Sequence, residues 1–422
     1  MLIEFRLRNY RCFRDEQVLS MVASSDQSHP ENVIDLGIPG VPRLLRSAVI
    51  YGANGSGKTT LLAALNFVDA FVSSSFSEKP NAKIRVYPYI FDEETSKSPT
   101  DFEIHFVKDN VRYQYGFTVD KQKVYKEWLY GAPNRREGKF FVRTWNAEKE
   151  DYDFELGSLL KPRIQKRVRE NALFLTAAAH DDHVQLRKIY DWFAPGLQGW
   201  EANNVPLRSV AEMLKNDEYK KQLLGMLRNA DFSVEDFHIT ERDLNIPDNA
   251  PVELKTALLS FPEESRRQIR VAMEHKTTDG RIVNLDLFGQ ESLGTQRFFT
   301  MGAAVINALH EGSVLYVDEI DSSMHPILSR ALIQICHDPN INCRNVQLIF
   351  NTHDTTLLDP DLFRRDQIWF TEKKKENGSG LYSLAEFSPR QGEALAKNYL
   401  QGRYGAIPFV GNLASEWSQG EC

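Results

Sequence analysis

The sequence contains little cysteine and no long apolar run. Its four cysteines, Cys12, Cys336, Cys343 and Cys422, are scattered and lack the spacing of a metal-binding motif. No window approaches the roughly 18 uninterrupted apolar residues that a membrane helix needs. The segment Met1–Arg6 alternates apolar and charged residues, which predicts a strand and not a secretion signal. We therefore expect a cytoplasmic protein with reduced thiols and no membrane contact.

An excess of positive charge is also absent, since the formal net charge is −7. Any contact with DNA or RNA would therefore have to be local. The best local candidate is the basic segment 161–169, although such a run is more often a solvated helix face. The run Lys373–Lys375 is weaker, because the Asn-Gly-Ser-Gly that follows it predicts an exposed hairpin turn.

Repeats, low-complexity tracts and sustained heptads are missing, which excludes solenoids and long coiled coils. A chain of 422 residues with 42% apolar and 26% charged residues can form a globular protein of two or three domains, or one large domain with insertions. Strand–helix alternation predicts a discontinuous α/β domain from residues 1–75 and 281–422. A two-residue period predicts an antiparallel β region over 76–155, belonging with that domain, and a helical period predicts a mainly helical insert over 156–280.

The segment Gly52–Thr59 matches the phosphate-loop pattern G-x-x-x-x-G-K-[ST] in full. An apolar run, Ser47–Tyr51, precedes it, and Thr60–Leu65 opens a helix, which is the strand–loop–helix context that the motif needs. A chance glycine turn would match in roughly one such chain in a hundred. The motif therefore predicts an α/β P-loop NTPase that binds ATP and Mg²⁺.

Residue types in the loop explain that chemistry. Glycines let backbone N–H groups converge on the phosphates beside the positive end of the helix dipole. Lys58 would reach the β- and γ-phosphates, and the Thr59 hydroxyl would bind Mg²⁺. The candidate nucleotide-binding residues are Asn54, Gly55, Ser56, Gly57, Lys58, Thr59 and Thr60.

A second acidic motif follows the apolar run Ser313–Val317. Asp318 stands where P-loop enzymes hold Mg²⁺, commonly through water. The adjacent Glu319 would polarise the attacking water as general base. Paired acids can also simply cap a following helix. The complete phosphate loop in the same chain favours the catalytic interpretation.

The order of four elements resembles an ABC-type ATPase head of the soluble branch that includes SMC and Rad50 proteins. These elements are Gly52–Thr59, Glu291–Arg297, Asp318–Glu319 and Phe350–Asp354. The resemblance implies that Ser292 and Gly294 belong to a signature loop that contacts the γ-phosphate bound on the opposite subunit. It also implies that 321–325 is the D-loop and that His353 is the switch histidine, a catalytic residue beside Glu319.

Two departures from the family pattern are visible. The signature reads S-L-G-T instead of S-G-G-Q, which resembles SMC-like branches more than transporters. No secure Q-loop glutamine follows the first helix, and Tyr87–Asp92 occupies its place. The N-terminal Arg8–Phe13 segment resembles the family's opening strand near the nucleotide.

Without heptads, the chain does not resemble a full SMC or Rad50 arm protein. It is more similar to the overcoming-lysogenization-defect group and to the stand-alone ATPase subunits of anti-phage systems such as Septu, PARIS and the RloA-type pairs. The segment Tyr399–Pro408 is similar to that group as well. Too few residues follow His353 for a Toprim nuclease module, and no His-Asn-His motif is evident, so a partner would do any cutting.

The resemblance implies a homodimer or higher homo-oligomer with composite ATP sites, which regulates a partner effector nuclease in anti-phage defence. The main alternative is an SMC/Rad50-like ATPase for DNA repair or DNA clamping. A transporter subunit fits less well, because the insert is large and the Q-loop is missing. A catalytically silent scaffold is disfavoured by the intact Lys58 and Glu319.

Overall fold

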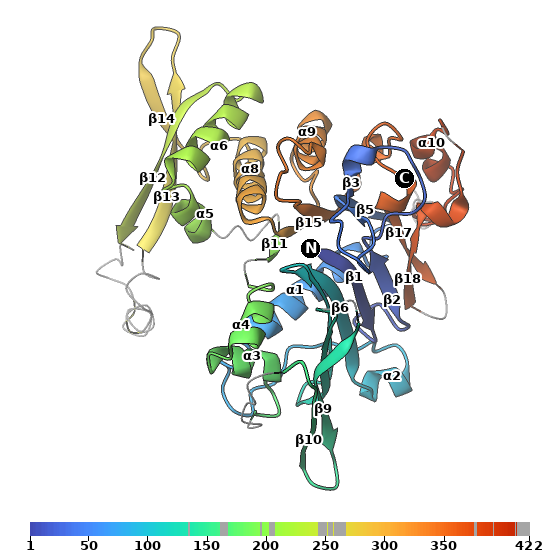
Figure 1. Ribbon diagram of the computed structural model, residues 1–422. Coiled ribbons are helices and arrows are strands. Elements are labelled where there is room, and N and C mark those ends of the chain that lie inside the picture. The colour runs from blue at the N-terminus through green and yellow to red at the C-terminus, as the bar shows by residue number, and fades with distance from the viewer. Residues whose placement is uncertain are drawn as a thin grey trace, which may run out of the picture. The chain divides into compact units, whose positions relative to one another are not determined.

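The structure is a computed structural model whose described residues form two compact units (Figure 1). It describes residues 1–133, 136–160, 168–194, 196–201, 207–243, 251, 256, 267–374, 378–390, 392–409 and 411. The first unit comprises Met1–Gly199, Glu311–Ile320 and Ile333–Cys422, and the second comprises Trp200–His310 and Asp321–Leu332. Most of the basic segment 161–169, as well as Lys375, lies outside the described residues.

The first unit contains a six-stranded, mostly parallel sheet. Its strands, in spatial order, are β11 (Leu197–Glu201), β15 (Val314–Asp318), β16 (Gln347–Asn351), β5 (Ser47–Gly52), β17 (Ile368–Lys374) and β18 (Gly378–Ser383). The pairs β15–β16, β16–β5 and β5–β17 are parallel, and β18 is antiparallel to β17. Strands β5 and β16 are buried along their whole length, as expected for parallel strands covered on both faces.

Helix α1 (Lys58–Ser74) packs against β5, β15 and β16. Its buried residues recur every three or four positions, including Leu61, Leu65, Val68 and Val72. A second face of α1 carries Phe67 and Phe71 into an aromatic cluster with the antiparallel sheet. Helix α1 therefore packs between the two sheets, and these contacts fix the position of its first residues.

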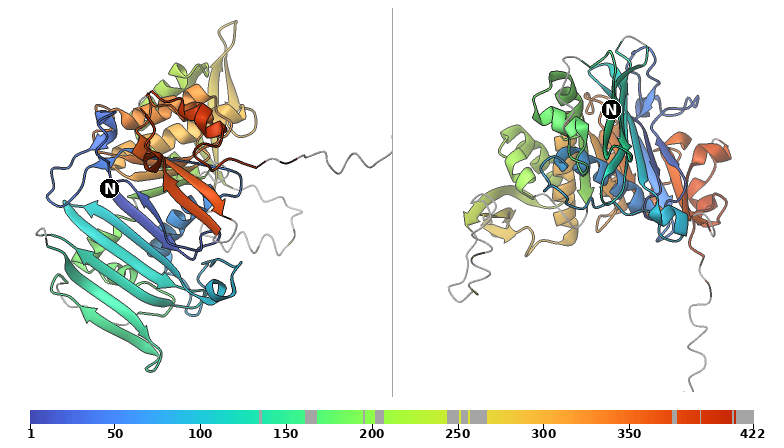
Figure 2. Two further views of the ribbon diagram at one scale, coloured as in Figure 1. Left: turned by 90° about the vertical axis from the view of Figure 1, so that its right-hand side faces the viewer. Right: turned by 90° about the horizontal axis from the view of Figure 1, so that it is seen from below.

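The antiparallel sheet has seven strands. In spatial order they are β10 (Asp151–Leu156), β9 (Gly138–Asn146), β8 (Val124–Gly131), β7 (Val111–Val119), β6 (Thr100–Lys108), β1 (Leu2–Arg8) and β2 (Gln17–Ser20). The left view in Figure 2 shows them side by side. The N-terminal strand β1 pairs with β6, which ties the antiparallel region to the same unit as the phosphate-loop segment.

Shorter elements complete the first unit. They are β3 (Val33–Ile34), β4 (Leu44–Leu45), α2 (Glu93–Lys97), α3 (Phe174–His180), α4 (Val184–Tyr190) and α10 (Leu395–Leu400), with 3-10 turns at Pro30–Asn32, Thr355–Leu357, Arg365–Gln367 and Leu384–Phe387. The amino end of α3 is held by Glu127, whose carboxylate accepts hydrogen bonds from the backbone N–H groups of Phe174 and Leu175. Arg143 lies 3.4 Å from the same carboxylate, and both side chains are fully buried.

The second unit packs helices on a three-stranded antiparallel sheet. Its elements are α5 (Leu207–Met213), α6 (Asp217–Asn229), β12 (Val234–Asp243), β13 (Arg267–Lys276), β14 (Ile282–Asp286), α8 (Leu293–Glu311, its last residue in the first unit) and the first part of α9 (Pro326–His337). Phe299 of α8 packs edge-on against Phe237 of β12, with ring centroids 5.1 Å apart. This contact joins the helix to the sheet.

The predicted domain boundaries differ from these units. Among the described residues of 156–280, helices α3, α4, α5 and α6 occur together with strands β11, β12 and β13, and β12 pairs with β13 over most of its length. Val271 and Met273 are buried two residues apart, which is strand periodicity. Helices α3 and α4 belong to the first unit, and residues 281–310 to the second. The α/β fold class itself is confirmed, because a six-stranded, mostly parallel sheet occurs together with antiparallel sheets of seven and three strands.

No helix in the described parts of the chain combines the length and the apolar character required to cross a membrane.

Candidate functional site

Three parallel strands of the first unit end at one edge of the six-stranded sheet. Strand β5 ends at Gly52, β15 at Asp318 and β16 at Asn351. Val317 lies opposite Phe350, and Asn351 lies opposite Ile50, so the three ends are in register. The carboxyl edge of a parallel sheet is where α/β proteins place their ligand sites. The sequence-predicted loop and acidic pair therefore meet there.

The phosphate loop turns tightly where glycine is required. Gly57 has φ 119°, and a Cβ atom there would lie 2.9 Å from Phe13 Cζ and 3.1 Å from Cys12 Sγ. A Cβ atom on Gly52 would lie 2.4 Å from the backbone oxygen of Thr371. The loop therefore packs closely against its neighbours and leads directly into α1. The positive end of the dipole of this 17-residue helix lies at the loop.

Lys58 is buried, with 6% of its surface exposed, and its ammonium group is held over the loop. Its Nζ donates to the carbonyl oxygens of Gly52 at 2.8 Å and Ala53 at 3.3 Å. Ser56 Oγ lies 2.7 Å from Thr371 Oγ1, which fastens the loop to β17. Asn54, Gly55 and Thr59 are exposed, and Thr60 is half-buried. A glycine-rich loop with a buried ammonium group at the N-terminus of a helix suits a polyphosphate.

The structure brings Thr59 and Asp318 into direct contact. Thr59 Oγ1 donates to Asp318 Oδ1 at 3.0 Å. Asn351 Nδ2 donates to the same carboxylate oxygen, so the carboxylate is held from two sides. A hydroxyl and a carboxylate side by side are the hard oxygen ligands that Mg²⁺ prefers, so these residues fit the expected metal ion.

Glu319 adopts a backbone conformation that non-glycine residues seldom adopt, with φ 53°. Its backbone N–H donates to Asn351 Oδ1 at 2.6 Å, and its side chain is exposed at the sheet edge. A strained residue costs on the order of 1–3 kcal/mol and persists only where its surroundings enforce it. The fully buried Asn351 side chain enforces it here, while also holding Asp318.

Sequence reasoning assigned no role to Asn351, although it lies within the motif Phe350–Asp354. The available signal was an amide side chain at the end of an otherwise apolar strand, directly before Thr352 and His353. A buried amide must satisfy its donors and its acceptor. Asn351 does so by bridging the two residues of the acidic pair.

His353 follows β16 at the same edge, and its side chain is exposed. The residue after it is fixed in two ways. Asp354 Oδ1 accepts from the N–H of Thr356 at 2.8 Å, and Tyr51 Oη donates to the carbonyl oxygen of Asp354 at 3.0 Å. Strand β5 and the segment after β16 are thereby tied together, which sets the backbone position of His353.

The C-terminal segment is fastened against the phosphate-loop strand. The Tyr399 ring lies 5.7 Å from Tyr51 and 5.4 Å from Phe370, and its hydroxyl donates to Ala406 at 3.1 Å. Burial raises the pKa of Tyr399 to about 12, although a hydrogen bond from the backbone of Gly52 opposes the shift. The segment Tyr399–Pro408, singled out only by resemblance, thus supports the base of the loop.

The segment Tyr87–Asp92, where the family pattern has its Q-loop, is fixed in position by the side chain of Asn9. Its Oδ1 accepts from the N–H of Tyr89 at 3.0 Å, and its Nδ2 donates to the carbonyl oxygens of Thr95 at 2.8 Å and Ser98 at 2.9 Å. Phe91 remains 80% exposed on this segment. Asn9 therefore shapes Tyr87–Asp92, where the sequence offered no glutamine.

The signature residues lie in the second unit. Ser292 is exposed and caps α8, because its Oγ accepts from the N–H of Thr295 at 3.1 Å. A Cβ atom on Gly294 would lie 3.2 Å from the backbone oxygen of Ser323, so the first turn of α8 adjoins the segment 321–325. The exposed serine and the N-terminus of a 19-residue helix form a surface suited to an anion.

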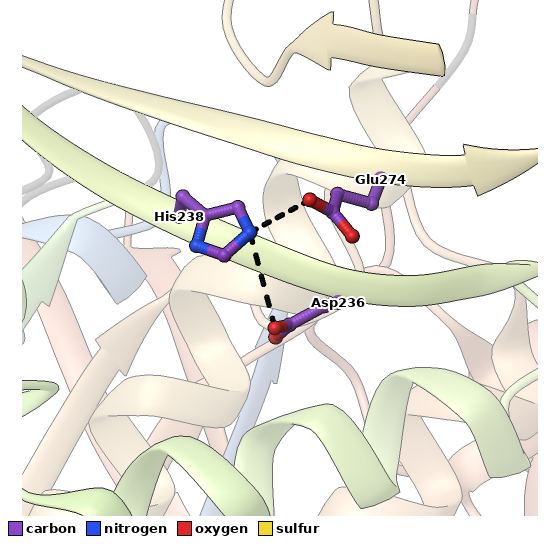
Figure 3. Close-up of side chains that lie close together, drawn as sticks. All are labelled: Asp236, His238 and Glu274. Atoms are coloured by element: carbon purple, nitrogen blue, oxygen red, sulfur yellow. Dashed lines mark hydrogen bonds and ion pairs between the residues drawn. The ribbon is translucent and has the colours of Figure 1, made fainter. Parts of the chain in front are cut away.

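Figure 3 shows a separate group on the sheet of the second unit, formed by Asp236 and His238 of β12 and Glu274 of β13. His238 Nε2 lies 2.7 Å from Glu274 and 3.9 Å from Asp236. Lys220 Nζ lies 3.0 Å from Asp236 and already supplies a positive charge to the pair of acids. The contacts are those of a surface ion-pair network.

No curated protein matches the chain significantly. Among solved structures, the SMC head domain from Thermotoga maritima is similar at 11% identity and a TM-score of 0.41, covering 90% of this chain and 98% of that one. An SMC head bound to the C-winged helix domain of ScpA is similar at 10% identity and a TM-score of 0.43, covering 92% and 99%.

Residues 47–359 match the family described as "AAA domain, putative AbiEii toxin, Type IV TA system". The matched segment runs from the strand before the phosphate loop to beyond His353. Because the match covers well over half of the chain, the protein belongs to this family of P-loop ATPases.

Proposed function

We propose that the protein binds and hydrolyses ATP at composite sites formed by two copies and thereby regulates a partner effector, a nuclease, in anti-phage defence. The observation that carries the ATPase proposal is the joint placement of Thr59, Asp318 and Glu319. Thr59 and Asp318 are in contact, and Asn351 holds both Asp318 and the backbone of Glu319. Transfer of a phosphoryl group to water requires a hydroxyl and a carboxylate for Mg²⁺ and a second carboxylate for the water, all close together.

Each residue then has a defined task. Lys58 and the backbone N–H groups of the loop bind the β- and γ-phosphates, and Thr59 and Asp318 hold Mg²⁺. The metal ion, when bound, neutralises negative charge on the phosphates. Glu319 orients the attacking water and accepts its proton. His353 lies at the same sheet edge and contacts the γ-phosphate.

Two copies complete one another's sites in this proposal. Ser292 and the N-terminus of α8 from one copy contact the γ-phosphate held by Lys58 of the other. The exposure of Ser292 supports this role, because its hydroxyl is accessible beside the backbone N–H groups of the first helical turn. ATP then binds the closed dimer better than the open one, and hydrolysis removes that bias.

Replacing Asn351 by alanine should lower kcat for ATP hydrolysis by roughly 10- to 100-fold, because both members of the acidic pair lose their fixed position. The matched control is Asn342→Ala. Asn342 is also a buried amide, and its Nδ2 donates to the carbonyl oxygens of Cys336 and Val346 near the opposite end of β16. Steady-state ATPase rates and melting temperatures should show similar loss of stability but loss of kcat only for Asn351→Ala. Equal kcat values would contradict the assignment.

The effector proposal rests on the resemblance to anti-phage ATPase subunits, and the family description, which names a toxin of a type IV toxin–antitoxin system, is compatible with it. Native mass spectrometry of the complex purified from its own host should reveal a bound nuclease. Its nucleic-acid cleavage should differ between wild-type protein and Glu319→Gln. If no such partner is found and ATPase activity instead rises with DNA length, the DNA-clamp alternative is correct.

A further inference from the structure

The segment that joins β14 to α8 is fastened to the middle strand of the second unit's sheet. His275 of β13 carries this connection, and its Nε2 lies 2.5 Å from Glu291 Oε1. Its Nδ1 lies 3.1 Å from the carbonyl oxygen of Ser233, the residue just before β12. The two side chains are 23% and 9% exposed, so solvent weakens the pair only partly. One ring thus bridges the sheet to the residue just before Ser292.

Both ring nitrogens of His275 face hydrogen-bond acceptors. A backbone carbonyl and a carboxylate each accept a hydrogen bond, so the ring is held from two sides. The bridge is therefore a second contact between this segment and β13, besides the hydrogen bond of 2.8 Å that the N–H of Leu287 donates to the carbonyl oxygen of Val271.

Glu291 transmits this position to the signature loop. Its carbonyl oxygen accepts from Gln296 Nε2 at 2.9 Å, in the first turn of α8, and its N–H donates to the carbonyl oxygen of Asp286 at 3.3 Å. Ser292 follows directly and caps the same helix. A shift of Glu291 must therefore move both the serine hydroxyl and the first turn of α8.

We propose that His275 is a positioning residue for hydrolysis, which aligns Ser292 through Glu291 and so couples the β12–β14 sheet to the ATP held by the other copy. The proposal rests on the proposed function, because it assumes that Ser292 completes a site in trans. Force or binding applied to the sheet reaches the signature through this bridge.

The chain offers a matched control on the same sheet. Successive residues of a strand point to opposite faces, so Glu274 and His275 face opposite ways. Glu274 pairs with His238 in the group of Figure 3. His238→Ala therefore removes a histidine–glutamate pair from the same sheet without touching Glu291.

In the full-length protein, His275→Ala should lower kcat for ATP hydrolysis about tenfold and leave the KM for ATP within about twofold, because the other copy's loop binds the nucleotide. His238→Ala should keep wild-type values. Mixed with Lys58→Ala copies, whose signature side is intact, His275→Ala should regain activity. Mixed with copies that carry a defective Ser292, it should not.

A second pair of variants distinguishes loss of the positioning contact from misfolding of a variant. Glu291→Gln keeps an oxygen acceptor for the ring and should retain most of the wild-type kcat, whereas Glu291→Ala should behave like His275→Ala. Wild-type kcat in both His275→Ala and Glu291→Ala, or an equal defect in His238→Ala, would overturn the positioning role. If Lys58→Ala and Glu319→Gln also hydrolyse ATP normally, the proposed function itself is wrong.

Discussion

Replacing Glu319 by glutamine is expected to lower kcat for ATP hydrolysis by roughly 100- to 10,000-fold, the range typical of a lost general base. Glutamine keeps the size of the side chain but cannot accept the proton of the attacking water. The backbone N–H of residue 319 still donates to Asn351, so the strained backbone should be retained. ATP should still bind, and ATP-stabilised association of two copies should persist or strengthen, because hydrolysis no longer removes the ATP that stabilises the closed dimer.

Steady-state phosphate release and size-exclusion chromatography with and without ATP measure both effects. Glu311→Gln provides a matched control, because Glu311 is an exposed carboxylate near the amino end of the same strand, β15. It should leave kcat and association unchanged. Normal ATP turnover by Glu319→Gln would show that another group is the base.

Two inactive variants should restore activity when mixed, which is the second large effect. Lys58→Ala should bind ATP roughly 10- to 100-fold more weakly, because charge-assisted hydrogen bonds to the phosphates are lost. Ser292→Asp keeps a good helix cap but places a negative charge beside the γ-phosphate of the other copy. In an equimolar mixture, mixed dimers contain one intact site of two, and about a quarter of the wild-type rate should return.

The control for this assay is the double variant that carries both changes. Mixed with either single variant, it forms no site that has both an intact Lys58 and an intact Ser292, so no activity should return. Melting temperatures of each variant exclude unfolding as the cause of inactivity. A mixture whose rate equals the average of the two variants would mean that Lys58 and Ser292 act in the same copy or in separate processes.

The sequence alone was sufficient to predict where residues that form local patterns lie in the fold. The phosphate loop was predictable because glycine spacing and one lysine determine how the backbone turns into α1, within a few residues. The acidic pair was predictable because an apolar run ending in two carboxylates places them at the end of a parallel strand. The antiparallel region also follows from a short-range alternation of residues.

Only the tertiary structure decided which distant residues support that chemistry. Asn351 holds Asp318 and Glu319, and Tyr399 supports Gly52, from positions far along the chain. The same holds for the second unit, where β12 and β13 form a sheet and His275 reaches Glu291. Sequence periodicity describes one segment at a time. Register between strands and contacts between segments arise when several segments bury their apolar faces together, so they can be read only from the folded chain.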